Sequence, residues 1–133
     1  MPVDNVELLR RGFEAFNRGG IEGLIELIHP DFEAQAPPEL TTEPGTYRGA
    51  EGLRRWFGGF EGIMEDVRFE PLDYIPSGDR VLVPVRLLAR GRDSGIEVQQ
   101  RGFQVWTLRD GKAIRLDTYA DLDTAREAAG LPT

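Results

Sequence analysis

Residues 80–119 have the sequence RVLVPVRLLARGRDSGIEVQQRGFQVWTLRDGKAIRLDTY, in which three largely apolar runs are separated by two turn-forming segments. The first turn is Gly91–Gly95, and the second is Arg109-Asp110-Gly111. An Asp-Gly pair between alternating apolar runs is a strong signal for a β-hairpin. The stretch therefore predicts successive antiparallel strands at residues 80–90, 96–108 and 112–119.

Two amphipathic helices are expected before residue 30. Asp4 caps the first, with Glu7 as its capping-box partner, and turn-forming residues 17–20 end it. A short second helix over residues 21–28 stops at His29-Pro30, because the residue before a proline disfavours helical backbone. His29 is then expected at a helix C-terminus, where the helix dipole stabilises a protonated imidazole.

A third helix is expected from Ala50 onward, because Leu53, Trp56, Phe57 and Phe60 form one stripe at helical spacing. Helices segregated from an antiparallel sheet define an α+β fold, and 133 residues are expected to form a single domain, 1–133. The other expected elements are strands at 32–36 and 67–75, a proline-containing loop at 37–45, a turn at 76–79, and a last short helix capped by Asp121 or Asp123 and ended by Gly130.

Strand alternation assigns the side chains to two faces of the sheet. Placing Leu108 opposite Ile114 gives one face, expected to border a cavity, and a second face that is also apolar. Three helices can cover only one face, so the second is predicted to form a homodimer interface, with cover by the C-terminal segment as the alternative. The first face holds Gln100, Gln104, Trp106, Leu108, Ile114, Leu116 and Thr118 with Leu82, Arg86 and Leu88, and the second holds Val81, Val83, Val85, Leu87, Phe103, Val105 and Tyr119 with Arg101, Arg115 and Asp117.

Composition excludes several classes of function. The formal charge of −7 argues against binding to nucleic acid or to anionic membranes. The chain has no cysteine and one histidine, so neither a disulfide nor a thiolate-based zinc site is expected, and no metal or cofactor is predicted. No signal peptide and no apolar run of membrane-spanning length are seen, so a cytoplasmic protein is expected.

Several segments together resemble the nuclear-transport-factor-2-like superfamily, and most closely its SnoaL-like, polyketide-cyclase-like branch. That resemblance implies a cone-shaped, curved, antiparallel or mixed sheet with three N-terminal helices packed on its concave face, a deep apolar cavity, and dimerisation through the outer sheet face. The superfamily includes ketosteroid isomerases, cyclases, epoxide-hydrolase-like enzymes and non-catalytic binding modules. The segments are GGIEGLIELIHPDF at 19–32, YRGAEG at 47–52, VWTLRDGK at 105–112, YAD at 119–121 and AAGL at 128–131.

The resemblance does not carry the ketosteroid isomerase mechanism to this chain. That mechanism needs an aspartate base, with a tyrosine and a protonated aspartate that donate hydrogen bonds to the oxyanion. The corresponding positions are Ala36, Gly12 and Gln104. All three positions lack the required aspartate or tyrosine, so the mechanism is rejected.

Two other reactions of the superfamily leave weak candidates. A cyclase-like reaction would use Asp117 or Asp121 as the base, although Asp117 is better explained by an ion pair with Arg101 or Arg115, and Asp121 by a helix cap. An epoxide hydrolase would need two carboxylates beside Arg86, and none is expected on that face.

The sequence therefore predicts a SnoaL-like protein that binds a small hydrophobic or aromatic molecule, without a defined catalytic acid–base set. Gln104 is the central polar candidate, since an amide can orient a ligand but cannot act as a general base at neutral pH. An isomerase-, cyclase- or hydrolase-like enzyme that uses Asp117 or Asp121 is one alternative, and a ligand-free dimerisation module is another. The expected ligand-binding residues are Gln104, Trp106, Gln100, Arg86, Trp56 and Tyr47, and the expected homodimer contacts are Val83, Val85, Phe103, Val105 and Tyr119.

Overall fold

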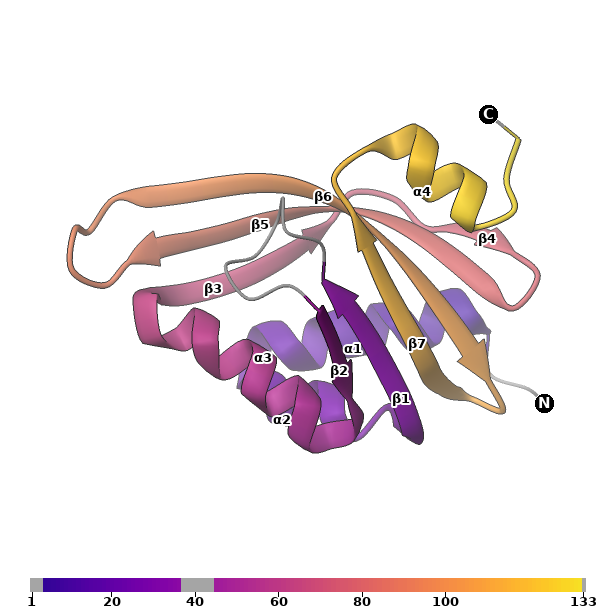
Figure 1. Cartoon of the computed structure of the whole chain (residues 1–133), viewed down its shortest axis with the longest axis horizontal. Helices are drawn as coiled ribbons and strands as arrows, with labels where there is room; N and C mark the ends of the chain where they lie inside the picture. Colours follow the sequence, from indigo (N-terminus) through magenta and orange to yellow (C-terminus); the bar gives the residue numbers. More distant parts are fainter. Residues whose placement is uncertain (1–3, 37–44, 133) are drawn as a thin grey trace.

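The computed structural model describes residues 4–36 and 45–132, and it is an α+β structure with a curved, unclosed sheet (Figure 1). Helices α1 to α3 lie on one side of the sheet and α4 lies on the other (Figure 1). No helix in the described ranges is long and apolar enough to cross a bilayer. The elements are α1 Asn5–Gly19, α2 Ile21–Ile25, β1 Ile28–Ala36, β2 Gly45–Arg48, α3 Gly49–Ile63, β3 Met64–Pro71, β4 Ile75–Ser77, β5 Arg80–Gly91, β6 Glu97–Arg109, β7 Lys112–Tyr119 and α4 Leu122–Ala128.

The sheet has the strand order β2-β1-β7-β6-β5-β3, with β4 paired to β5. The predicted meander of β5, β6 and β7 is confirmed, and both of its pairings are antiparallel. β1 runs parallel to β7, which makes the sheet mixed. The proline-containing loop expected at 37–45 lies outside the described residues except for Gly45, which begins β2.

Asp4 caps helix α1 as predicted, whereas the Glu7 carboxylate, expected to complete a capping box, pairs with Arg10 and Arg11; the helix is also tied to the sheet at its far end. Asp4 Oδ1 accepts a hydrogen bond from the Val6 amide at 2.9 Å. Near the other end, Asn17 donates to the Phe69 carbonyl at 2.9 Å and accepts from the Phe69 amide at 3.0 Å. This two-way bond fixes the backbone of β3 at Phe69 against α1.

The second helix is shorter than expected, and the prediction for His29 is wrong. α2 ends at Ile25, and β1 has begun by Ile28, so His29 lies in a strand and not at a helix C-terminus. Its Nδ1 accepts a hydrogen bond from the Asp31 amide at 3.0 Å. The pairing of β1 with β7 shifts register between Ile28 and Glu33, and this irregular part of the strand accommodates Pro30, which has no amide proton to donate.

The single strand expected at residues 67–75 is two strands in the structure. β3 ends at Pro71, and β4 covers Ile75–Ser77. The turn predicted at 76–79 therefore starts only at residue 78 in the structure. Both segments pair with β5, β3 along its second half and β4 at its start. Residues 72–74 carry the chain between these two positions along one edge of the sheet.

The face prediction is correct for β6 and β7 and wrong for β5. Val81 pairs with Trp106, Val83 with Gln104 and Leu87 with Gln100, so these β5 residues lie on the concave face. Leu82 pairs with Val105 on the outer face. Alternation does separate the two parities of β5, because residues 81, 83, 85, 87 and 89 are all apolar while the other parity carries Arg80, Arg86 and Arg90. The error was a one-residue slip in the expected register of β5 against β6.

One register detail in the last hairpin also differs from the prediction. The β6–β7 pairing shifts between Thr107 and Leu108, so Leu108 pairs with Ala113 rather than Ile114. The shift is confined to the end of the hairpin beside the turn. Further along, Trp106 still pairs with Leu116 and Gln104 with Thr118, as expected.

Both faces of the sheet carry a hydrophobic cluster. The larger one joins α1, α3 and the concave face around Phe13, Leu53, Trp106 and Leu116. On the outer face, Ala125 and Ala129 at the C-terminal end cover Leu82 and Val105. The alternative in which the C-terminal segment folds over the second face is therefore correct for that part of the face.

Candidate functional site

A small apolar cavity lies between the concave face and helices α1 to α3. We call it the inner cavity, and its volume is about 30 Å³, close to the space of one water molecule. Among the described residues that line it, Gln104 is the only one with a polar side chain other than the Trp indoles. The lining residues are Leu9, Gly12, Phe13, Phe16, Ile21, Leu24, Leu53, Trp56, Phe69, Gln104, Trp106 and Leu116.

A second cavity of about 40 Å³ adjoins the inner one. Trp56, Phe69 and Gln104 line both cavities, and we call these three residues the shared wall. Displacement of a wall side chain would join the two spaces into one. The second cavity is completed by Phe60, Val85, Leu87, Gln100, Arg101, Gly102 and Thr118.

Gln104 is held in one orientation by its neighbour on the same strand face. Its side chain is buried, with 4% of the residue exposed, and Trp106 Nε1 donates a hydrogen bond to its Oε1 at 2.9 Å. An indole N–H can only donate, so the amide must present its oxygen to Trp106 and leave its NH₂ group facing elsewhere. No described residue accepts a hydrogen bond from that nitrogen.

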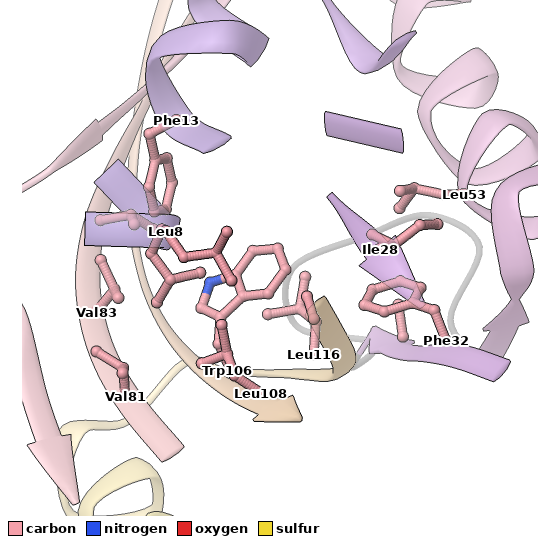
Figure 2. Packing of buried hydrophobic residues seen from close by; sticks show 14 of the residues in the cluster. Leu8, Phe13, Ile28, Phe32, Leu53, Val81, Val83, Trp106, Leu108 and Leu116 are labelled. Atoms are coloured by element: carbon pink, nitrogen blue, oxygen red, sulfur yellow. The ribbon is translucent and has the colours of Figure 1, made fainter. Parts of the chain in front are cut away.

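Trp106 is itself fixed by aromatic packing, so it is a rigid support for the amide. Figure 2 shows its indole at the centre of the core, between Leu8 and Leu116. Phe13 meets it edge-on with ring centroids 6.3 Å apart, and Phe32 lies tilted against it at 6.4 Å. Such aromatic pairs favour defined geometries, which limits the rotation of Trp106.

Four of the six expected ligand-binding residues line a cavity. Gln104, Trp106 and Trp56 line the inner cavity, and Gln100 lines the second. Tyr47 is buried in the core behind the shared wall, where its ring lies 6.2 Å from that of Trp56.

The prediction that Arg86 lines the cavity is wrong, because Arg86 lies on the outer face of the sheet. It pairs across strands with Arg101, and its Nη1 is 3.9 Å from a carboxylate oxygen of Glu70 on β3. The parity error in β5 placed it in the cavity. The same error placed Val83 and Val85 at the expected dimer interface, whereas both are buried in the concave-face core.

Sequence reasoning missed the residues that α1 and β3 contribute to the inner cavity. The helical spacing of Phe13 and Phe16 did place them on one face of α1, but it could not show that this face borders an empty space. Phe69 was expected in a strand without an assigned face. Its role in the shared wall depends on how β3 packs beside α1, which the local pattern does not contain.

The two carboxylates considered as catalytic bases lie away from both cavities. Asp117 is on the outer face, where both its oxygens accept hydrogen bonds from Arg115 at 2.8 and 3.1 Å. Asp121 caps α4 and accepts two hydrogen bonds from Thr124. The bond from the Thr124 backbone amide, and to a lesser degree the bond from its hydroxyl, lower the pKa of the Asp121 carboxyl. Neither group lines a cavity, so neither could transfer a proton to a molecule bound there.

The chemistry available in the inner cavity is therefore hydrogen bonding and packing. Gly12 and Gln104, two of the positions where a ketosteroid isomerase needs acids, both line it, and neither is titratable. Ala36, the third position, packs against the core. Within residues 4–36 and 45–132, no group of histidine and carboxylate side chains is arranged to hold a metal ion.

Solved structures similar to this one share the nuclear-transport-factor-2-like fold. TerC, crystallised with polyporic acid, is 26% identical, with a TM-score of 0.78 over 95% of this chain and 98% of its own. A protein from a soil-derived mobile gene cassette is also 26% identical, with a TM-score of 0.75 over 86% and 87% of the two chains. A Burkholderia pseudomallei protein with this fold and unknown function is 21% identical, with a TM-score of 0.78 over 92% and 95%.

The family model of the SnoaL-like domain matches residues 9–116. The chain therefore belongs to the SnoaL-like domain family, and it has the nuclear-transport-factor-2-like fold. No functionally curated protein was found to match the sequence.

Proposed function

We propose that the protein binds a small hydrophobic or aromatic molecule between its helices and the concave face of its sheet, and that it does so without acid–base catalysis. The observation that carries this proposal is the partner-free amide nitrogen of Gln104, held by Trp106 at the wall of an otherwise apolar cavity. Ligand sites are mostly apolar and contain a few polar groups that fix orientation. The crystal structure of the 26% identical TerC with polyporic acid supports the same class of ligand.

Binding requires the shared wall to move. A cavity of about 150 Å³ accommodates one benzene ring, which is several times the inner cavity of about 30 Å³. Displacing a wall side chain would join the inner cavity to the second cavity of about 40 Å³. The volume that the side chain vacates would have to supply the rest of the space for a ring. We therefore expect a binding site that opens around its ligand.

The first test is to identify a ligand and to weaken its binding from the cavity side. Organic extraction and mass spectrometry of the natively purified protein should yield a small hydrophobic compound. Calorimetric titration should then show that Gln104→Ala and Trp106→Ala each weaken its binding by roughly tenfold, since each loses a hydrogen bond or an aromatic contact.

Phe103→Ala is the matched control. Phe103 directly precedes Gln104 on β6, but it lies on the opposite face of the sheet, where it pairs with Tyr119. The Phe103→Ala variant should bind the extracted ligand with the same affinity as wild type. Equal affinities in all four proteins would contradict the proposed site, and the absence of any bound compound would favour the ligand-free dimerisation module.

We also propose that the protein forms a homodimer through the part of the outer face beside α4. The interface residues expected from the sequence are reduced to Phe103 and Tyr119, which remain partly exposed, because Val105 is covered by α4. Sedimentation velocity at micromolar concentration should give about twice the chain mass of 14.9 kDa. Phe103→Arg should shift the protein to the monomer, because it places a charge at the centre of this face; a monomeric wild type would contradict the proposal.

A further inference from the structure

The shared wall holds a second hydrogen-bond donor besides the Gln104 amide. Trp56 Nε1 is buried and has no hydrogen-bond partner, and it is the only such side-chain nitrogen or oxygen in the described part of the chain. Its ring contacts are aromatic, with Phe60 edge-on at 5.6 Å and Tyr47 tilted at 6.2 Å. A buried N–H without an acceptor is costly, and such a group in a native structure calls for an explanation.

The indole of Trp56 is held by ring contacts alone, whereas the Gln104 side chain is held by a hydrogen bond from Trp106. Phe69 is anchored through the two hydrogen bonds of its backbone with Asn17, and Gln104 is anchored through Trp106. Trp56 lies on α3, is only partly buried, and makes no hydrogen bond through its indole. We expect a ring-sized ligand to displace Trp56, which would place the ligand beside both this indole and the Gln104 amide, since both residues line the two cavities.

The polar groups of the wall are complementary to one kind of ligand atom. The free groups of Trp56 and Gln104 are both donors, since the oxygen of the amide already accepts from Trp106. No charged side chain among the described residues lines the inner cavity, and Arg101, which borders the second cavity, lies at the outer-face parity of β6 opposite Arg86. A ligand carboxylate beside Gln104 would therefore be buried without a counter-charge. A neutral oxygen that only accepts hydrogen bonds satisfies both donors at no such cost.

We propose that the protein recognises a neutral carbonyl oxygen on a hydrophobic ring compound, and that Trp56 Nε1 and the Gln104 amide nitrogen are its two donors. This inference rests on the proposed function and specifies the chemical class of the ligand. Trp56 then acts as a specificity-determining residue of the site, in addition to forming an apolar wall.

The test compares 1-indanone with indane, a bicyclic ketone and the hydrocarbon of nearly the same shape. In calorimetric titrations, wild type should bind 1-indanone about tenfold more tightly than indane. Trp56→Phe keeps an aromatic ring and removes the N–H, so it should lose most of this preference while its affinity for indane stays within about twofold. Gln104→Leu should lose the preference in the same way.

A nitrogen–proton correlation spectrum gives a direct reading of the bond, because the chain has only two tryptophans. The indole signal of Trp56, assigned by its absence in Trp56→Phe, should move downfield with 1-indanone and not with indane. The Trp106 signal is the internal control, since its N–H is already bonded to Gln104.

The outcomes separate the two proposals. Binding of both probes with no ketone preference, or a preference that Trp56→Phe retains, would overturn the donor pair and leave the hydrophobic site standing. An indole signal that is unchanged by the ketone would show that the N–H only packs against the Tyr47 or Phe60 ring, and would also overturn it. Binding of neither probe would reject the proposed function and this inference with it.

Discussion

Gln104→Glu is expected to lower the free energy of unfolding by about 3–4 kcal/mol at pH 7 and to leave it nearly unchanged near pH 4. The introduced carboxyl would occupy a site that is 4% exposed and surrounded by apolar residues. Trp106 Nε1 offers it one fixed donor, which does not replace the hydration that a carboxylate loses on burial. In its neutral form the carboxyl has nearly the shape of the amide, so the variant should fold normally in acid.

The direction of the pH dependence follows from where the proton is held. Burial raises the pKa of the introduced carboxyl above its ordinary value of about 4.3, while the unfolded chain keeps that value. Between the two pKa values, the folded state retains a proton that the unfolded state has released. The free energy of unfolding should therefore fall by about 1.4 kcal/mol for each pH unit above about 4.3, until the folded pKa is reached.

Urea denaturation at pH 4, 5.5 and 7 measures this slope. Gln100→Glu is the matched control, because Gln100 lies on the same strand and face but is only partly buried, in the second cavity. It should show a much smaller pH effect, and Gln104→Leu should show none beyond that of wild type. A Gln104→Glu profile parallel to wild type would mean that water reaches this position freely, contrary to the burial of Gln104 among apolar residues.

The position of Gln104 was predictable because the last hairpin pairs it with Thr118, as expected from the sequence. Gln104 and Trp106 share one parity on β6, and the Asp-Gly turn fixes the hairpin that sets their partners on β7. The cap formed by Asp121 was predictable for a similar reason, since it is a local hydrogen bond to a residue three positions later. Features that depend on neighbouring residues in the chain could thus be derived from the chain itself.

The features that failed depend on packing between distant segments. Arg86 was assigned to the wrong face because the expected register of β5 against β6, across the turn at residues 91–95, was one residue out. The unpaired Nε1 of Trp56 results from packing of α3 against the rest of the core, so no sequence pattern signals it. The same is true of the small volume of the cavity, which is what remains after large side chains have packed.

Leu53→Ala is expected to cost about 3–5 kcal/mol of stability and at the same time to create room for a small aromatic molecule. Leu53 is fully buried, belongs to α3, and lines the inner cavity opposite the sheet. Truncation removes its contacts and adds the vacated volume to an existing space, so the surrounding side chains cannot easily close it. Figure 2 shows Leu53 on the side of the core that faces Phe32 and Ile28, away from Val81 and Val83.

Because the vacated volume joins the proposed binding site, a ligand should recover part of the lost stability. Benzene at ten times its Kd would return about 1.4 kcal/mol, which a thermal denaturation series with increasing benzene can measure. Leu108→Ala is the matched control, since Leu108 is equally buried in the same core but lines neither cavity. The Leu108→Ala variant should lose a similar amount of stability and recover much less of it with benzene.

Equal recovery of stability in the two variants would show that any vacated leucine site binds benzene, and it would contradict the proposal that the inner cavity is the binding site. Recovery confined to Leu53→Ala would instead show that the cavity is the weak point of the packing, where a ligand of the right size replaces the contacts that the protein lacks.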